Sequence, residues 1–184
     1  PRANGIWAID LPEDDELVNA RLTDGQQDIM LFSSSGKCIR FSESDVRSMG
    51  RVARGVIGIR LQEGQQVVSM LVVGEGDILT VTENGYGKRT VPEDYPRQGR
   101  GGQGVIGIQT SDRNGALISA IHVNSEDHIM LISDGGTLVR TRAGEISTLS
   151  RNTQGVTLIR LRQDEKLVGL ARIEMEHDEE AVGP

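Results

Sequence analysis

Arginine and lysine residues recur at fixed positions along this chain, and they are the side chains best suited to bind a ligand. One series follows a turn glycine by four residues, and a second series precedes another glycine by four residues: Arg40, Arg89 and Arg140, then Arg51, Arg100 and Arg151. A guanidinium group binds phosphate in a bidentate manner, and spaced guanidinium groups suit a phosphate backbone. The two series therefore predict a basic surface that contacts nucleic acid.

The arginines belong to a repeat of about fifty residues. Its anchoring glycines, Gly5, Gly55, Gly104 and Gly155, are 50, 49 and 51 residues apart, and each precedes an apolar segment. A second marker recurs in phase, a turn dipeptide between two apolar runs: Ser35-Gly36, Asn84-Gly85 and Gly135-Gly136. These dipeptides predict two-residue hairpin turns of type I′, which need positive φ at both central positions.

Each repeat is expected to form four short strands. In the second copy they are 55–61, 66–73, 77–82 and 86–91, which are β-branched and apolar and too short for helices. Four strands in about fifty residues is the size of a propeller blade, so the fold class is all-β and propeller-like. We expect one domain or partial ring over 1–175, with repeats at about 1–50, 51–99, 100–150 and 151–175, and a disordered acidic tail over 176–184. The ring would hold roughly four blades or be an arc of a larger one.

The net charge of the whole chain does not reveal the basic surface. The chain has 184 residues, with 20 Lys+Arg against 27 Asp+Glu and a net charge of -7. The windows 33–55, 83–104 and 134–155, from each turn to the next glycine, hold 12 basic and 7 acidic residues. The rest of the chain holds 8 basic and 20 acidic residues. Positive charge is thus concentrated at equivalent points of the blades.

Other kinds of chemistry find little support. The run Gly99–Gly104 reads G-x-G-x-x-G, but a dinucleotide site needs a strand before it and a helix after it, and neither is predicted here. The histidines are not spaced as metal ligands, and a single cysteine, Cys38, allows no internal disulfide. Five aromatic residues are too few for a platform that stacks single-stranded bases. We expect neither a metal site nor a catalytic group, and no membrane partner.

The repeat resembles the C-terminal domain of the A subunit of bacterial DNA gyrase. The residues that carry the resemblance are Asn84-Gly-Tyr-Gly-Lys-Arg-Thr90, Gly136-Thr-Leu-Val-Arg-Thr-Arg142 and Arg151-Asn-Thr-Gln-Gly-Val156. It implies a β-pinwheel of about six blades, of which this chain would be the later ones. It also implies that duplex DNA bends and wraps around a basic rim, without sequence specificity, in support of ATP-dependent negative supercoiling.

The predicted basic rim contains eleven residues that would bind DNA: Lys37, Arg40, Arg51, Arg54, Lys88, Arg89, Arg97, Arg100, Arg140, Arg142 and Arg151. The family's signature box resembles 98–104, that is Gln98, Gly99, Arg100, Gly101, Gly102, Gln103 and Gly104. The family pattern has basic residues at its second and sixth positions, which are Gly99 and Gln103 here, so this copy is a degenerate box.

The resemblance further implies a place in a larger enzyme. The expected partners are double-stranded DNA, the gyrase B subunit, and the remainder of the gyrase A subunit, in the bacterial cytoplasm. The chain itself would not be an enzyme and would need no cofactor, because ATP and magnesium are used elsewhere in the parent topoisomerase. Two alternatives stay open: the equivalent domain of topoisomerase IV, from its own A-type subunit, and a propeller that binds protein and not DNA.

Overall fold

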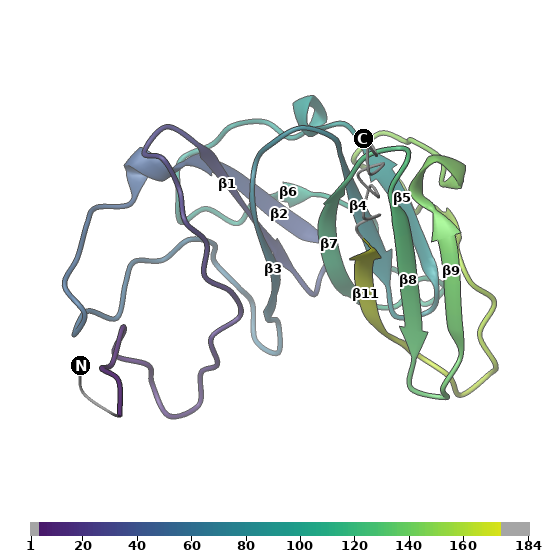
Figure 1. Ribbon diagram of the computed structural model, residues 1–184, viewed down its shortest axis with the longest axis horizontal. Coiled ribbons are helices and arrows are strands. Elements are labelled where there is room, and N and C mark those ends of the chain that lie inside the picture. The colour runs from purple at the N-terminus through teal and green to yellow at the C-terminus, as the bar shows by residue number, and fades with distance from the viewer. Residues whose placement is uncertain (1–3, 174–184) are drawn as a thin grey trace, which may run out of the picture.

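The computed structural model describes residues 4–173, and in them β-strands form three antiparallel sheets (Figure 1). The first sheet has the order β3-β1-β2-β6, from β3 (Val67–Val72), β1 (Asp28–Ser33), β2 (Lys37–Ser42) and β6 (Val105–Ile106). The second has the order β10-β5-β4-β7, from β10 (Val156–Thr157), β5 (Tyr86–Thr90), β4 (Asp77–Thr82) and β7 (Leu117–Val123). The third has the order β11-β8-β9, from β11 (Leu167–Ile173), β8 (His128–Ser133) and β9 (Leu138–Arg142). The all-β class is confirmed.

A short 3-10 helix follows each hairpin: η1 (Glu43–Asp45), η2 (Pro92–Asp94) and η3 (Ala143–Glu145). Among residues 4–173, these turns are the only helical segments, and none is long or apolar enough to cross a membrane. Strand β1 forms because its apolar run is buried on both faces, as the neighbouring residues Ile29 and Met30 illustrate with 9% and 0% of their surface exposed. The predicted strands 66–73, 77–82 and 86–91 correspond to β3, β4 and β5 within one residue at each end.

The turn type predicted from the sequence is wrong. In each predicted turn pair only the second residue, Gly36, Gly85 or Gly136, has a positive φ. In the second hairpin, the Gly85 amide donates to the Thr82 carbonyl at 3.0 Å, and Gly85 has a φ of +85°. This is a three-residue loop in which a turn is followed by a left-handed glycine, the second common way to close a hairpin.

The first strand of each repeat is exchanged between sheets. The predicted strand 55–61 does not form: only Ile59 makes an isolated bridge, to Gly102. In the third and fourth copies it shortens to β6 and β10, which pair with the hairpins of the first and second repeats. Each of these first strands therefore pairs with a hairpin two repeats earlier. The segment 55–61 forms no strand because the described chain has no hairpin two repeats before it.

The three sheets converge along one edge. The edge strand β7 contacts both β3 and β11, and the Ser69 hydroxyl in β3 accepts a hydrogen bond from the Ala120 amide in β7 at 2.9 Å. From this edge the strand order runs to β6, β10 and β9 at the far sides of the three sheets, which follow one another as blades along the chain (Figure 1). Between the first two sheets, Phe32 and Tyr95 pack edge to face with ring centroids 6.0 Å apart.

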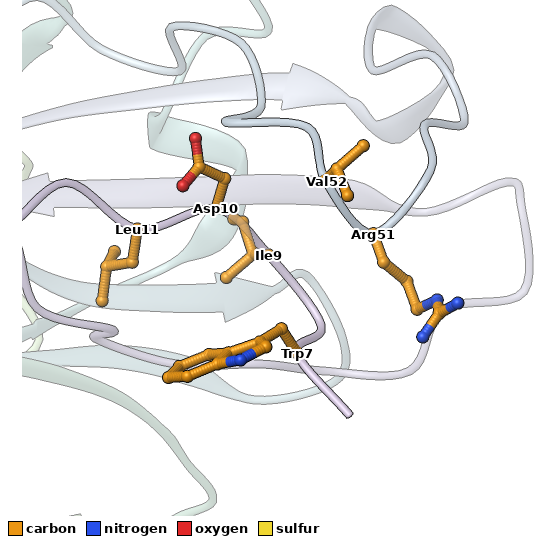
Figure 2. A pocket seen from close by; sticks show the side chains of 6 residues that line it. All are labelled: Trp7, Ile9, Asp10, Leu11, Arg51 and Val52. Carbon is orange, nitrogen blue, oxygen red and sulfur yellow. The ribbon is translucent and has the colours of Figure 1, made fainter. Parts of the chain in front are cut away.

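Residues 4–26 contain no strand, although the sequence predicted a first blade that begins there. Their partners by the repeat pattern would be hairpins upstream of β1. The segment instead lies against the start of the second repeat, where the Asp10 amide donates to the Ala53 carbonyl at 3.3 Å. Figure 2 shows the resulting pocket, with Trp7, Ile9 and Leu11 on one segment and Arg51 and Val52 on the other. Trp7 is 88% exposed. The predicted acidic tail, 176–184, lies outside the described residues.

Candidate nucleic-acid interface

Arg40 and Arg89 occupy the same position in two blades and connect each blade to the next. The Arg40 Nε donates to the Asp28 carboxylate at 2.8 Å, and its Nη1 donates to the Pro92 carbonyl at 2.9 Å. The Arg89 Nε donates to the Ile146 carbonyl at 2.9 Å, and its Nη1 contacts Asp77 at 3.1 Å. These side chains are 21% and 12% exposed. The sequence predicted surface groups at both positions, but most of each guanidinium is engaged within the protein.

Arg140 is the third member of this series and has a different environment. It is exposed, and its Nε donates to the His128 Nδ1 at 3.2 Å. His128 stands where Asp28 and Asp77 stand in the earlier copies, so the intrablade contact persists with an imidazole in place of a carboxylate. Because Arg140 is exposed whereas Arg40 and Arg89 are 21% and 12% exposed, its charge lies closer to solvent than those of its two counterparts.

Arg100 and Arg151 hold the exchanged segments in place. The Arg100 Nε donates to the Asp45 carbonyl at 3.1 Å, and its Nη1 donates to the Ile57 carbonyl at 2.5 Å. Arg151 repeats both contacts one blade later, with the carbonyls of Asp94 and Ile106. The regular spacing of this arginine series thus has a structural cause: each copy ties the end of one hairpin to the segment that crosses between blades.

Lys88 is buried, so its predicted place on the exposed basic rim is wrong. It has no exposed surface, and its Nζ donates to the carbonyls of Ser150 and Arg151 and to the Thr153 hydroxyl. Burial, with a smaller contribution from the Arg151 charge, lowers the pKa of the Lys88 ammonium from 10.5 to about 8. A sequence signal existed: Lys88 follows the turn glycine by three residues, where the other copies have Ile39 and Val139. This is a core position of the repeat.

The remaining residues of the predicted rim keep part of their surface. Besides Arg140, four arginines are exposed, and they are Arg51, Arg54, Arg97 and Arg142. The Arg97 Nη2 contacts the Asp28 carboxylate at 2.8 Å, yet its side chain stays 58% exposed. The Arg54 Nε contacts Asp10 at 2.7 Å, and its side chain is 71% exposed. Lys37 is half-buried at the start of β2. The exposed positive charge of the predicted rim is therefore smaller than the sequence suggested.

The degenerate box, 98–104, forms a loop that locks two repeats together. The Gln98 amide donates to the Arg40 carbonyl at 2.7 Å, and the Gly101 amide donates to the Gly58 carbonyl at 2.7 Å. Gly104 has a φ of +72°, and a Cβ there would lie 2.3 Å from the Cys38 carbonyl oxygen. Glycine is required at this point because the two backbones approach too closely for a side chain. No helix follows, so the structure excludes a dinucleotide site of the Rossmann type here.

Comparison with known proteins identifies the family. The sequence profile of the DNA gyrase C-terminal domain, beta-propeller, matches residues 2–24, 27–74, 76–124 and 127–174. The chain belongs to the DNA gyrase C-terminal domain family. The last three matched segments each begin at a hairpin and end just after β3, β7 or β11. The β-pinwheel expected from the sequence resemblance is the fold observed.

The relatives are gyrase A subunits that are much longer than this chain. The A subunit of DNA gyrase from Pseudomonas aeruginosa is 59% identical over 175 residues, which are 95% of this chain and 19% of that protein. The A subunit of DNA gyrase from Escherichia coli strain K12 is 53% identical over 180 residues, which are 97% of this chain and 21% of that protein. This gyrase C-terminal domain chain therefore spans about a fifth of the length of these relatives, which are components of a topoisomerase.

Two solved structures share the fold. A DNA gyrase A C-terminal domain superposes with a TM-score of 0.83 at 29% identity, and the match covers 93% of this chain and 59% of that one. The C-terminal domain of a DNA topoisomerase IV superposes with a TM-score of 0.84 at 25% identity, and covers 91% of this chain and 53% of that one. Both neighbours extend well beyond the matched region.

Proposed function

We propose that this gyrase C-terminal domain chain binds duplex DNA through phosphate contacts and without reading bases. The observation that carries the proposal is a set of exposed basic side chains on or beside the strands farthest from the convergent edge, among them Arg97, Arg140 and Arg142. Arginine contacts to phosphates release counterions and carry no sequence information by themselves. The scarcity of aromatic residues supports the same mode, because base stacking needs them.

The residues that take part are fewer than the eleven predicted from the sequence. Lys88 is excluded by burial, and Arg40, Arg89, Arg100 and Arg151 act mainly between blades. The proposed contacts are Lys37, Arg51, Arg54, Arg97, Arg140 and Arg142. With this reduced set, and with Arg100 engaged in protein contacts, we expect the isolated chain to bind DNA with modest affinity.

In its parent protein, this surface would bend and wrap DNA. Bending a duplex of 20–30 base pairs costs on the order of 1–6 kcal/mol, so several phosphate contacts spread over successive blades are needed to offset it. The proposed partners are DNA, the gyrase B subunit, and the remainder of the gyrase A subunit in the bacterial cytoplasm. The parent would use ATP and magnesium elsewhere to introduce negative supercoils, and this chain would contribute no catalytic group or cofactor.

Gel-shift titrations with duplexes of increasing length, each at several salt concentrations, test the proposal. Log affinity should fall with log salt by about 0.9 per phosphate contact, and affinity should rise with duplex length if the DNA wraps. Arg142→Ala should reduce the slope by about 0.9, whereas Arg21→Ala, an exposed arginine outside the predicted rim, should leave it unchanged. A binding constant independent of salt would refute DNA binding through phosphates.

The topoisomerase IV domain remains a second candidate, because its C-terminal domain superposes as well as that of gyrase A. The two candidates differ in the reaction of the parent enzyme. The full-length parent chain, assembled with ATP and its partner, should convert relaxed plasmid to the negatively supercoiled form if the gyrase assignment holds. Relaxation without any gain of negative supercoils would favour the topoisomerase IV assignment.

A further inference from the structure

A polar pocket lies at the turn end of the β4–β5 hairpin, between the second and third sheets. Its volume is about 540 Å³, and it is lined by four basic side chains, Arg113, Arg160, Arg162 and Lys166. None of these four belongs to the basic rim predicted from the sequence. Arg89 lies near the opposite end of the same hairpin, where β4 begins and β5 ends. The pocket is therefore distinct from the proposed contacts at that end of the blades.

Two of the cations are held in place before any ligand binds. The Arg113 guanidinium lies 4.2 Å from the centre of the Tyr86 ring, and its Nη2 donates to the Gly155 carbonyl at 3.1 Å. Stacking on an aromatic ring leaves the outer edge of a guanidinium available to a bidentate acceptor. The Lys166 Nζ donates to the Asn84 Oδ1 at 2.5 Å and lies 4.0 Å from a Glu83 oxygen.

One carboxylate, Glu165, lines the pocket, and its oxygens are already engaged. It hydrogen-bonds the Ser133 hydroxyl and accepts from the Arg162 backbone amide at 3.1 Å. The hydrogen bond from Ser133 is the main cause that lowers the pKa of Glu165 to about 2. Its side chain orders the loop, and the four cations around it leave the pocket with an excess of positive charge. Arg160 and Arg162 are exposed, so they are accessible to a ligand.

The fold does not require this cluster. The Lys166 carbonyl accepts from the Asp134 amide just as the Ala116 carbonyl accepts from the Glu83 amide, which aligns the two loops. At the junction one blade earlier, the residues in the places of Arg160, Arg162 and Lys166 are Gln109, Ser111 and Ala116. The same loop thus forms there with no basic residue at these three positions. Arg100 and Arg151 differ in this respect, because they repeat the same bridging contacts.

We propose that this pocket binds a phosphate group. The Arg113 guanidinium and the Lys166 ammonium are held in place, and the exposed guanidinium groups of Arg160 and Arg162 line the same polar pocket. Guanidinium groups match the fork-like arrangement of phosphate oxygens, and charge-assisted hydrogen bonds are the strong ones. The phosphate could belong to a DNA backbone that continues past the turn end of the hairpin, which rests on the proposed function, or to a free oligophosphate anion. The shared chemistry is the same for both sources, and the experiment separates them.

The first arm of the test uses inorganic pyrophosphate and the full 184-residue chain, followed by calorimetry or by side-chain NMR of the arginines. The double variant Arg160→Ala/Arg162→Ala should weaken pyrophosphate binding about tenfold or more. Arg60→Ala is the matched control, because Arg60 holds the same repeat position as Arg160 and is also exposed. It should change the affinity by less than about twofold, and circular dichroism should show that both variants fold.

The second arm repeats the salt titration with duplex DNA. If the pocket holds a backbone phosphate, the double variant should reduce the salt slope by about 1.8, twice the value for one contact. If it holds a free anion, pyrophosphate binding should fall while the DNA slope stays unchanged. Unchanged pyrophosphate affinity together with an unchanged DNA slope would overturn the pocket proposal. A salt-dependent wild-type DNA affinity would show in that case that the proposed DNA-binding function still stands.

Discussion

Replacing Lys88 with methionine tests whether this lysine is a buried structural residue or a DNA contact. Methionine has a similar length and apolar character, so it can fill the space that the Lys88 side chain occupies. The substitution removes one buried ammonium and its hydrogen bonds to Ser150, Arg151 and Thr153. The Ser150 carbonyl keeps a donor, because the Thr153 hydroxyl also donates to it at 2.9 Å. The Arg151 carbonyl likewise keeps the Thr153 amide at 3.1 Å.

Two opposing contributions set the size of the effect at pH 7. A pKa lowered from 10.5 to about 8 means that the folded state disfavours the ammonium by about 3 kcal/mol as an upper limit, since water screening reduces it. Methionine escapes this penalty but loses hydrogen bonds that contribute about 1 kcal/mol each. The gain and the loss nearly cancel. We expect Lys88→Met to change the free energy of unfolding by less than about 1.5 kcal/mol at pH 7.

Alkaline pH should separate the two proteins. Between pH 8 and pH 10.5 the unfolded wild-type chain holds a proton on Lys88 that the folded chain has lost, so wild-type stability rises with pH by up to about 1.4 kcal/mol per unit relative to the variant. Urea unfolding of both proteins at pH 7 and about pH 9.5 measures this difference in the free energy of unfolding. The contributions of groups that titrate in both proteins cancel when the two are compared. The DNA salt slope should be the same for both. A pH-independent difference, or a slope that drops by about 0.9 in the variant, would refute the burial argument.

Three further substitutions or reactions test the architecture. Arg89→Ala should lower the free energy of unfolding by about 1–3 kcal/mol because it unties two blades, whereas Arg142→Ala, which is exposed, should cost less than about 0.5 kcal/mol in the same urea titration. Gly85→Val should lower the free energy of unfolding by about 4 kcal/mol or more, because Gly85 has a φ of +85° and a Cβ would lie 2.5 Å from the Ile159 carbonyl oxygen. A thermal melt of the variant with the same transition temperature as the wild type would contradict this. The Cys38 thiol should react slowly with a disulfide reagent until urea is added, since burial raises its pKa to about 12, and fast labelling of the native protein would disprove its burial.

The repeat and its hairpins could be predicted from the sequence because they depend on local pattern. The apolar and β-branched run before the turn glycine determines β4, the turn places β5 directly after it, and the structure has both strands within one residue of the prediction. The exchanged strands could not be predicted in the same way. Whether Val105 and Ile106 pair with a neighbouring hairpin or with one two repeats away depends on the arrangement of whole blades, which periodicity does not encode.

The basic surface was predicted only in part, for a related reason. Regular spacing correctly identified Arg40 and Arg89 as one pair of equivalent residues and Arg100 and Arg151 as another. A residue at an equivalent position can stabilise the fold as well as bind a ligand. In a repeat protein, the contacts between blades recur with the same period as any binding surface. The pocket around Arg113 shows the converse, because Arg113, Arg162 and Lys166 have no basic counterparts in the other repeats and so had no periodic signal.

Because β2 pairs with the distant strand β6, the first sheet cannot be completed until β6 has been synthesised. Val105 follows Ser42 by 63 positions, so the first sheet lacks its fourth strand until more than one further repeat has been made. At about 5–20 residues per second, a ribosome needs roughly 3–13 seconds to supply that strand. Throughout this interval the free edge of β2 exposes unpaired backbone groups, which can pair with another nascent chain. The interlocked blades thus leave the growing chain vulnerable to misassembly, even though the finished sheets are well paired.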